Sequence, residues 1–158
     1  MPNRTIHIYI GDQRAAILEN NTQIKIYPIS SASLGIGFEM GSNKTPTGKF
    51  RVHKKIGHEH PEGTVFRSRV ASGEVCGENP RSSLWQSSED LVLSRILWLE
   101  GCDPENSNTL DRYIYLHGTN QEHLIGTPAS HGCIRLRSKD IIELFELVDE
   151  GTEVQIFG

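Results

Sequence analysis

Ser130-His131-Gly132-Cys133-Ile134-Arg135 is the stretch around which this chain is organised, and His117-Gly118 precedes it. Together the two segments hold one cysteine, two histidines and one arginine. Cysteine is the strongest side-chain nucleophile near neutral pH once a neighbouring base helps it to form the thiolate. The arginine adds a cation suited to a carboxylate. These residue types therefore indicate an enzyme that transfers an acyl group.

Strand geometry assigns a role to each member of the two segments. In an extended chain, His131, Cys133 and Arg135 would lie on one face. Gly132 would let the backbone bend so that neighbouring amide N–H groups converge as an oxyanion hole. Same-face neighbours on a strand lie about 7 Å apart, from ~3.3 Å per residue, so His131 is too far from the thiol for direct proton transfer. We therefore predict that His117, at the end of a separate strand, is the base and that His131 supports the site.

Size and composition limit the class of protein. The chain has 158 residues and a net charge of −4, which predicts one globular domain over residues 1–158 and gives no reason to expect nucleic acid or an anionic membrane as partner. No apolar run approaches the ~18 residues that span a membrane, and no secretory leader is visible. We expect a cytoplasmic protein, or a periplasmic one if a leader has been removed. The odd number of cysteines does not predict a disulfide framework.

Hydrophobic periodicity predicts a mainly β chain with one C-terminal helix. Ile6, Ile8 and Ile10 alternate with polar residues in the first strand. The predicted strands cover residues 5–10, 15–19, 23–29, 50–54, 91–100, 112–117 and 152–157, with short strands around 65–70. Residues 45–48 suit a type I turn, because proline stands second and glycine fourth.

The helix is predicted from residue 138 onward. Its buried face carries Ile141, Leu144, Phe145 and Val148, which follow the i, i+3, i+4, i+7 pattern. Ser138 is the predicted N-cap and Gly151 the predicted C-terminal cap.

These motifs resemble the signature of the YkuD-type L,D-transpeptidase catalytic domains. The Ser-His-Gly-Cys element with its upstream His-Gly pair is highly specific, and Thr45-Pro46-Thr47-Gly48-Lys49-Phe50 is similar to a second element of that family. The resemblance covers about residues 5–157. It implies a fold of mixed sheets, sandwich-like or barrel-like, with one main helix at the C-terminal end. The family often has asparagine where this chain has Ser138, which we expect to be a structural substitution.

The resemblance also implies a mechanism on peptidoglycan stem peptides. Cys133 would attack the carbonyl at the L-centre of the third-position diamino acid, usually meso-diaminopimelate, and the terminal D-alanine would leave. The Gly118 carbonyl would orient His117, and Arg135 would hold a substrate carboxylate. The backbone N–H groups of residues 131–133 would form the oxyanion hole. The candidate catalytic residues are Cys133, His117, Gly118, His131 and Gly132, and the candidate substrate-binding residues are Arg135, Ser130 and Trp85.

The acyl-enzyme has two possible acceptors. Water would make the protein an L,D-carboxypeptidase, and an amine would make it an L,D-transpeptidase that forms 3–3 cross-links or exchanges D-amino acids. Without a leader or anchor in view, we predict a cytosolic carboxypeptidase that trims tetrapeptides to tripeptides in murein recycling. Residues 57–90 would form a flap over the donor site. Family members are acylated by carbapenems, so we expect this chain to be a carbapenem target.

Three other interpretations carry less weight. A sortase also places histidine before cysteine and arginine, but its Thr-Leu-x-Thr-Cys pattern is absent. A non-catalytic muropeptide-binding module would have little reason to keep Cys133 with His117. His58-Glu59-His60 matches no zinc-site spacing, so no metal, no cofactor and no obligate protein partner is predicted. The expected ligands are stem peptides or muropeptides.

Overall fold

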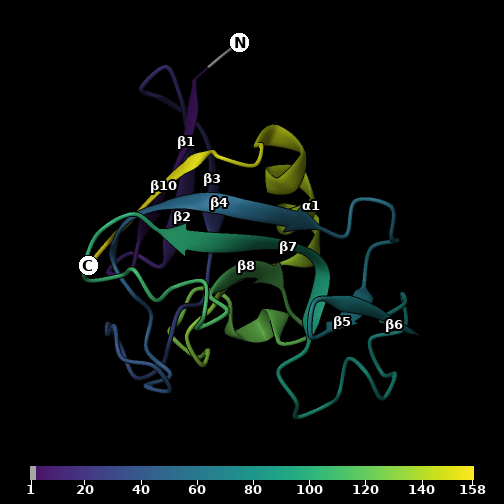
Figure 1. Ribbon diagram of the computed structural model, residues 1–158. Helices are drawn as coiled ribbons and strands as arrows, with labels where there is room; N and C mark the ends of the chain where they lie inside the picture. Colours follow the sequence, from purple (N-terminus) through teal and green to yellow (C-terminus); the bar gives the residue numbers. More distant parts are fainter. Residues whose placement is uncertain (1–2) are drawn as a thin grey trace.

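The computed structural model describes residues 3–158 and builds them around one mixed β-sheet (Figure 1). The first two residues of the predicted domain lie outside the described residues. The strands are β1 (Arg4–Tyr9), β2 (Arg14–Glu19), β3 (Thr22–Pro28), β4 (Gly48–Ile56), β5 (Thr64–Arg67), β6 (Val70–Val75), β7 (Val92–Gly101), β8 (Tyr115–Gly118), β9 (Ile134–Leu136) and β10 (Glu153–Phe157). The helices are a short 3-10 helix η1 (Glu122–Leu124) and α1 (Ser138–Leu147). The mainly β prediction with one main helix is confirmed.

The strand order places the C-terminal strand inside the sheet. The path is β3-β2-β1-β10-β4-β7-β5-β6, and β8 branches from β7 to pair with β9. Two pairs are parallel, β1 with β10 and β8 with β9. The sheet is therefore mixed, as predicted, and β7 is the strand from which the β8–β9 pair extends.

The core lies between the sheet and α1. Ile6 and Ile8 are fully buried in β1, which confirms the predicted alternation. Ile141, Leu144 and Phe145 are buried on the inner face of α1, which packs against β7 and β8. This packing fixes the strand that leads to His117. No helix within residues 3–158 is long and apolar enough to cross a membrane.

Both predicted helix caps are wrong. Arg137 occupies the N-cap position and makes no capping bond with its side chain. The Ser138 N–H instead donates to Glu122 Oε2 at 2.9 Å, and the Ser138 hydroxyl accepts from Ser94 Oγ at 2.7 Å. The helix ends at Leu147, before Gly151, which adopts a φ of +91° in the turn into β10.

Two further predictions, a turn and the start of a strand, differ from the structure. Residues 45–48 do not form a hydrogen-bonded turn, because Thr45 bridges Ile36 and Gly48 already begins β4. The predicted strand over 112–117 starts only at Tyr115. The weakly patterned segment 57–90 contains the β5–β6 hairpin, which pairs with β7 and agrees with the short strands predicted around residues 65–70.

Candidate active site

The sulfur of Cys133 is held by the segment that leads into β8. The Tyr115 N–H donates to Cys133 Sγ at 3.3 Å, and the thiol donates to the Tyr113 carbonyl oxygen at 3.3 Å. Cys133 is only partly exposed and packs on a small apolar cluster that includes Phe66 and Ile96. The thiol is thus fixed in position while part of the residue stays open to a ligand.

His117 is buried in β8 and is oriented by the next residue. Its Nδ1 atom lies 2.5 Å from the Gly118 carbonyl oxygen. Because a carbonyl oxygen only accepts, Nδ1 carries the proton and Nε2 keeps the lone pair that a base needs. Leu116 lies opposite Ile134 in the parallel β8–β9 pair, and Cys133 directly precedes Ile134. Cys133 and His117 therefore lie on adjacent segments, and the role of His117 as the base stays a prediction.

Burial sets the resting charge of this pair. Desolvation lowers the pKa of His117 below its usual value, although the nearby Asp90 opposes the shift. Desolvation also raises the pKa of the Cys133 thiol to about 12, against a smaller opposing effect of the hydrogen bond from Tyr115. At neutral pH both groups are therefore uncharged. The site thus holds a protonated thiol and an imidazole free base on adjacent segments.

Two glycines in the signature are required by close approach and backbone conformation. A Cβ on Gly118 would lie 2.6 Å from the Leu93 carbonyl oxygen and 3.1 Å from Ser138 Oγ. Gly132 has a φ of +131°, which side chains disfavour. Gly118 thus lets β8 lie against β7 and α1, and Gly132 turns the chain just before Cys133.

Two hydroxyl groups fix the peptides on either side of Cys133. Thr45 Oγ1 donates to the Gly132 carbonyl oxygen at 2.9 Å, and Ser130 Oγ donates to the Cys133 carbonyl oxygen at 2.6 Å. In a planar trans peptide the N–H points away from the C=O. Thr45 therefore sets the direction of the Cys133 N–H, one of the predicted oxyanion-hole donors. The oxyanion hole itself stays a prediction.

Arg135 is where the structure differs most from the sequence-based expectation. Its side chain is fully buried. Nη1 donates to Asp90 Oδ1 at 3.0 Å and to Gln121 Oε1 at 2.6 Å, and Nη2 donates to Ser30 Oγ at 3.0 Å. The structure places Arg135 behind the site as a support for Asp90. Because Arg135 exposes no hydrogen-bond donor, it cannot make the predicted contact with a substrate carboxylate in this structure.

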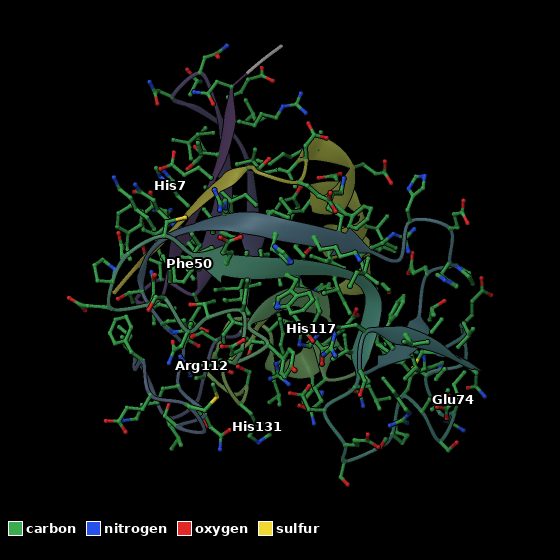
Figure 2. The ribbon with its side chains drawn as sticks, in the orientation of Figure 1. His7, Phe50, Glu74, Arg112, His117 and His131 are labelled. Carbon is green, nitrogen blue, oxygen red and sulfur yellow. The ribbon has the colours of Figure 1, made fainter. Side chains whose placement is uncertain are left out.

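The shared face predicted for residues 131–135 is wrong. Residues 131–133 form a bend, and the strand begins only at Ile134. His131 projects outward with 74% of its side chain exposed, and its Nδ1 lies 3.7 Å from Asp90 Oδ2. Figure 2 shows His131, His117 and Arg112 on one side of β7, below it in the view. His131 thus borders the site from the surface, and its supporting role stays a prediction.

Comparison with known proteins now places this geometry in a family. The sequence profile of the L,D-transpeptidase catalytic domain, YkuD, matches residues 3–156. The chain belongs to the L,D-transpeptidase family. The putative L,D-transpeptidase YkuD of Bacillus subtilis (strain 168) is 28% identical over 151 residues, which are 96% of this chain and 64% of that protein.

Solved L,D-transpeptidase structures share the fold. The structure of LD transpeptidase LdtMt1 in complex with imipenem has a TM-score of 0.59 at 19% identity, over 99% of this chain and 59% of that one. The structure of L,D-transpeptidase 3 from Mycobacterium tuberculosis in complex with a faropenem-derived adduct has a TM-score of 0.61 at 16% identity, over 99% of this chain and 61% of that one. The chain thus spans less than two thirds of the length of these relatives.

One predicted member of the L,D-transpeptidase site lies in a separate cavity. Trp85 lines a cavity of about 940 Å³ beside the start of α1, and Cys133, His117 and His131 are not among the lining residues. The Trp85 indole N–H donates to the Gly77 carbonyl oxygen at 2.6 Å. The structure does not bring Trp85 to the thiol, and its contact with substrate stays a prediction.

Sequence reasoning missed four residues that build this L,D-transpeptidase site. Tyr113 and Tyr115 hold the sulfur, Thr45 holds the peptide before it, and Asp90 pairs with Arg135. Thr45 stands in the motif that was recognised, so its position carried a signal. Asp90 lies in a polar run without periodicity and carried none. Within residues 3–158 no group of three or more His, Cys, Asp and Glu side chains is arranged to hold a metal ion.

Proposed function

We propose that this L,D-transpeptidase domain forms a cysteine acyl-enzyme on peptidoglycan stem peptides and cleaves the bond between diaminopimelate and D-alanine. The observation that carries the proposal is the partly exposed Cys133 thiol on the segment next to His117, whose Nε2 is free to accept a proton. The named relatives support the same class of reaction.

The first half-reaction follows from the uncharged resting pair. His117 Nε2 takes the Cys133 proton while the sulfur attacks the carbonyl at the L-centre of the third residue. The C–N bond then breaks, the proton passes from His117 to the departing D-alanine amine, and a thioester remains on Cys133. The Cys133 N–H, directed by Thr45, would stabilise the oxyanion.

For the second half-reaction we propose water as the acceptor. Water gives its proton to His117 and attacks the thioester, the C–S bond breaks, and the thiol is restored. The product is a tripeptide stem, which makes the protein an L,D-carboxypeptidase of the kind expected in cytoplasmic murein recycling. The partial exposure of Cys133 beside the exposed His131 supports access for water.

An amine acceptor is the second candidate, and the names of the relatives favour it. Mass spectrometry of a disaccharide tetrapeptide, incubated with the protein with and without a free D-amino acid, separates the two. Loss of D-alanine alone supports the carboxypeptidase. Cross-linked dimers or D-amino-acid exchange as the main products would contradict it and support the transpeptidase.

Cys133→Ala is the control for catalysis. We expect it to abolish turnover and to keep binding of the tetrapeptide, because the side chain is small and only partly buried. Turnover that survives in Cys133→Ala would contradict the acyl-enzyme. Imipenem, with which a structural neighbour forms a complex, gives a direct check, since the proposal expects a mass adduct on the peptide that contains Cys133. A wild-type protein that binds tetrapeptide without turnover or adduct would be a muropeptide-binding module.

A further inference from the structure

The turn of the β5–β6 hairpin has an unusual backbone. Ser68 and Arg69 connect Arg67 to its strand partner Val70 and have φ values of +49° and +67°. Two left-handed residues form the turn that suits a two-residue hairpin, but asparagine and glycine are the residues that adopt it readily. An arginine in this conformation is sterically unfavourable, so contacts elsewhere must hold it there.

Those contacts are aromatic. The Arg69 guanidinium lies 4.4 Å from the centre of the Tyr113 ring and 5.2 Å from that of the Trp98 ring. Its Nη1 donates to Tyr115 Oη at 3.0 Å. Tyr113 is itself left-handed, with a φ of +54°. Two residues in unfavourable conformations thus meet in one stacked contact, which is the kind of strain that collects at functional sites.

The same two tyrosines hold the nucleophile. The Tyr113 carbonyl accepts from the Cys133 thiol, and the Tyr115 N–H donates to its sulfur. Their side chains meet Arg69 while their backbones meet Cys133. The guanidinium and the thiol therefore both contact the same short segment, residues 113–115.

The charge of Arg69 is not balanced by any carboxylate within the described part of the chain. Arg67, two residues earlier, pairs with Glu74 and Glu89, and Arg135 pairs with Asp90. Among the described residues 3–158, no carboxylate forms an ion pair with Arg69, which is only partly buried. Stacking on aromatic faces leaves the edge of a guanidinium free for a planar anion, and a carboxylate matches its fork.

We propose that Arg69 binds a carboxylate of the stem peptide next to the scissile bond, the role that the sequence assigned to Arg135. The inference rests on the proposed function and identifies Arg69 as a residue that recognises the stem peptide. Two carboxylates flank the cleaved bond, the terminal one of D-alanine and the side-chain one of the third-position diamino acid. Both present the same chemistry to Arg69.

The test compares three tetrapeptides by kcat/KM for release of the fourth residue. The first is the parent, the second ends in D-alaninamide, and the third has a carboxamide in place of the third-position side-chain carboxylate. The proteins are wild type, Arg69→Gln and the matched control Arg67→Gln, since Arg67 lies on the same hairpin with its charge already paired. Arg69→Gly is the second variant, because glycine accepts the left-handed backbone and preserves the turn.

We expect the wild type to lose about 10- to 100-fold in kcat/KM on at least one amidated peptide, the range for a charge-assisted hydrogen bond. The peptide that is disfavoured identifies which carboxylate is bound. Both Arg69 variants should lose a similar factor on the parent and no longer distinguish it from that amide. Arg67→Gln should discriminate as the wild type does.

Unchanged alkylation of Cys133 by the neutral reagent iodoacetamide shows that the site is intact in each variant. Discrimination that persists in both Arg69 variants, or that is absent from an active wild type, overturns the inference. A wild type that releases the fourth residue from none of the peptides contradicts the proposed function itself, and the inference falls with it.

Discussion

At the scale of single residues, the charge state of Cys133 and His117 governs how the site works. Burial holds the thiol in its protonated form and the imidazole in its free-base form. Many reactive cysteines are instead activated as thiolates by a nearby cation. Here we expect the thiol to lose its proton only as it attacks the substrate. Cys133 should therefore react slowly with simple alkylating reagents and fast with a substrate that fits the site.

This difference can be measured by alkylation. We expect the rate at which iodoacetamide labels Cys133 to be low at pH 7 and to rise continuously through pH 9, because thiolate accumulates only as the pH nears about 12. Peptide mapping by mass spectrometry separates Cys133 from the exposed Cys102, which serves as an internal reference. A labelling rate that is already high at pH 6 and flat above it would contradict the uncharged pair and indicate a thiolate–imidazolium pair.

Alkylation of Cys133 depends on alkaline pH, whereas turnover should depend on acidic pH, where His117 becomes protonated. Burial lowers the pKa of His117 below its usual value, so the free base predominates at pH 7 and turnover should fall as the pH drops through that lowered pKa.

Thr45 offers a second test at this scale. Its hydroxyl group holds the Gly132 carbonyl and accepts from the Ala32 N–H. Thr45→Val keeps the shape of the side chain and removes both hydrogen bonds. The Cys133 N–H is then no longer oriented toward the oxyanion, so we expect kcat to fall at least about 10-fold with little change in KM. The lost bonds should also lower the free energy of unfolding by about 1–2 kcal/mol. Thr47→Val is the control, and an equal fall in kcat for both variants would contradict the role of Thr45.

At the scale of elements, the start of α1 is anchored by a different helix. The Glu122 carboxylate from η1 accepts the Ser138 N–H, so η1 supplies the negative charge that favours a helix N-terminus. The Ser138 side chain is occupied with Ser94 of β7. The cap thus ties together the elements that surround Gly118, the residue that orients His117.

Removing this cap should weaken the helix. We expect Glu122→Ala to lower the free energy of unfolding by about 1 kcal/mol, the usual value of an N-terminal cap, as measured by urea denaturation. Glu59→Ala, which changes an exposed glutamate in the loop before β5, is the matched control. Equal stability of the two variants would show that the Glu122 contact does not stabilise α1.

At the scale of the whole molecule, regular alternation was enough to predict most strands and the buried face of α1. Ile6 and Ile8 in β1 and Leu144 in α1 lie where their spacing placed them. The β5–β6 hairpin was only hinted at, because Ser68-Arg69 lacks the asparagine or glycine that signals such a turn. The sequence did not predict that Arg135 is buried, because its partner Asp90 lies 45 residues away in sequence. A pairing at that distance leaves no local pattern.

For the candidate site, the sequence predicted the central residues but not the contacts that surround them. The motif singled out Cys133 and His117, and the structure places both on adjoining segments. The surroundings of the sulfur were not predictable, because they depend on the left-handed backbone of Tyr113 and on the hydrogen bond from Thr45 to the distant Gly132 carbonyl. Such features follow from tertiary packing, which overrides local preference.

The position of β10 has a consequence for how the chain folds during synthesis. Within residues 3–158, the strands β3-β2-β1 and the strands β4-β7-β5-β6 are hydrogen-bonded to each other only through β10, which is made after all of them. Until that strand emerges from the ribosome, the two partial sheets have unpaired edges, and such edges can pair with other chains. The many contacts between distant residues also predict slow folding, in milliseconds to seconds. Completion of the sheet therefore depends on β10, and on protection of the two open edges until that strand has been made.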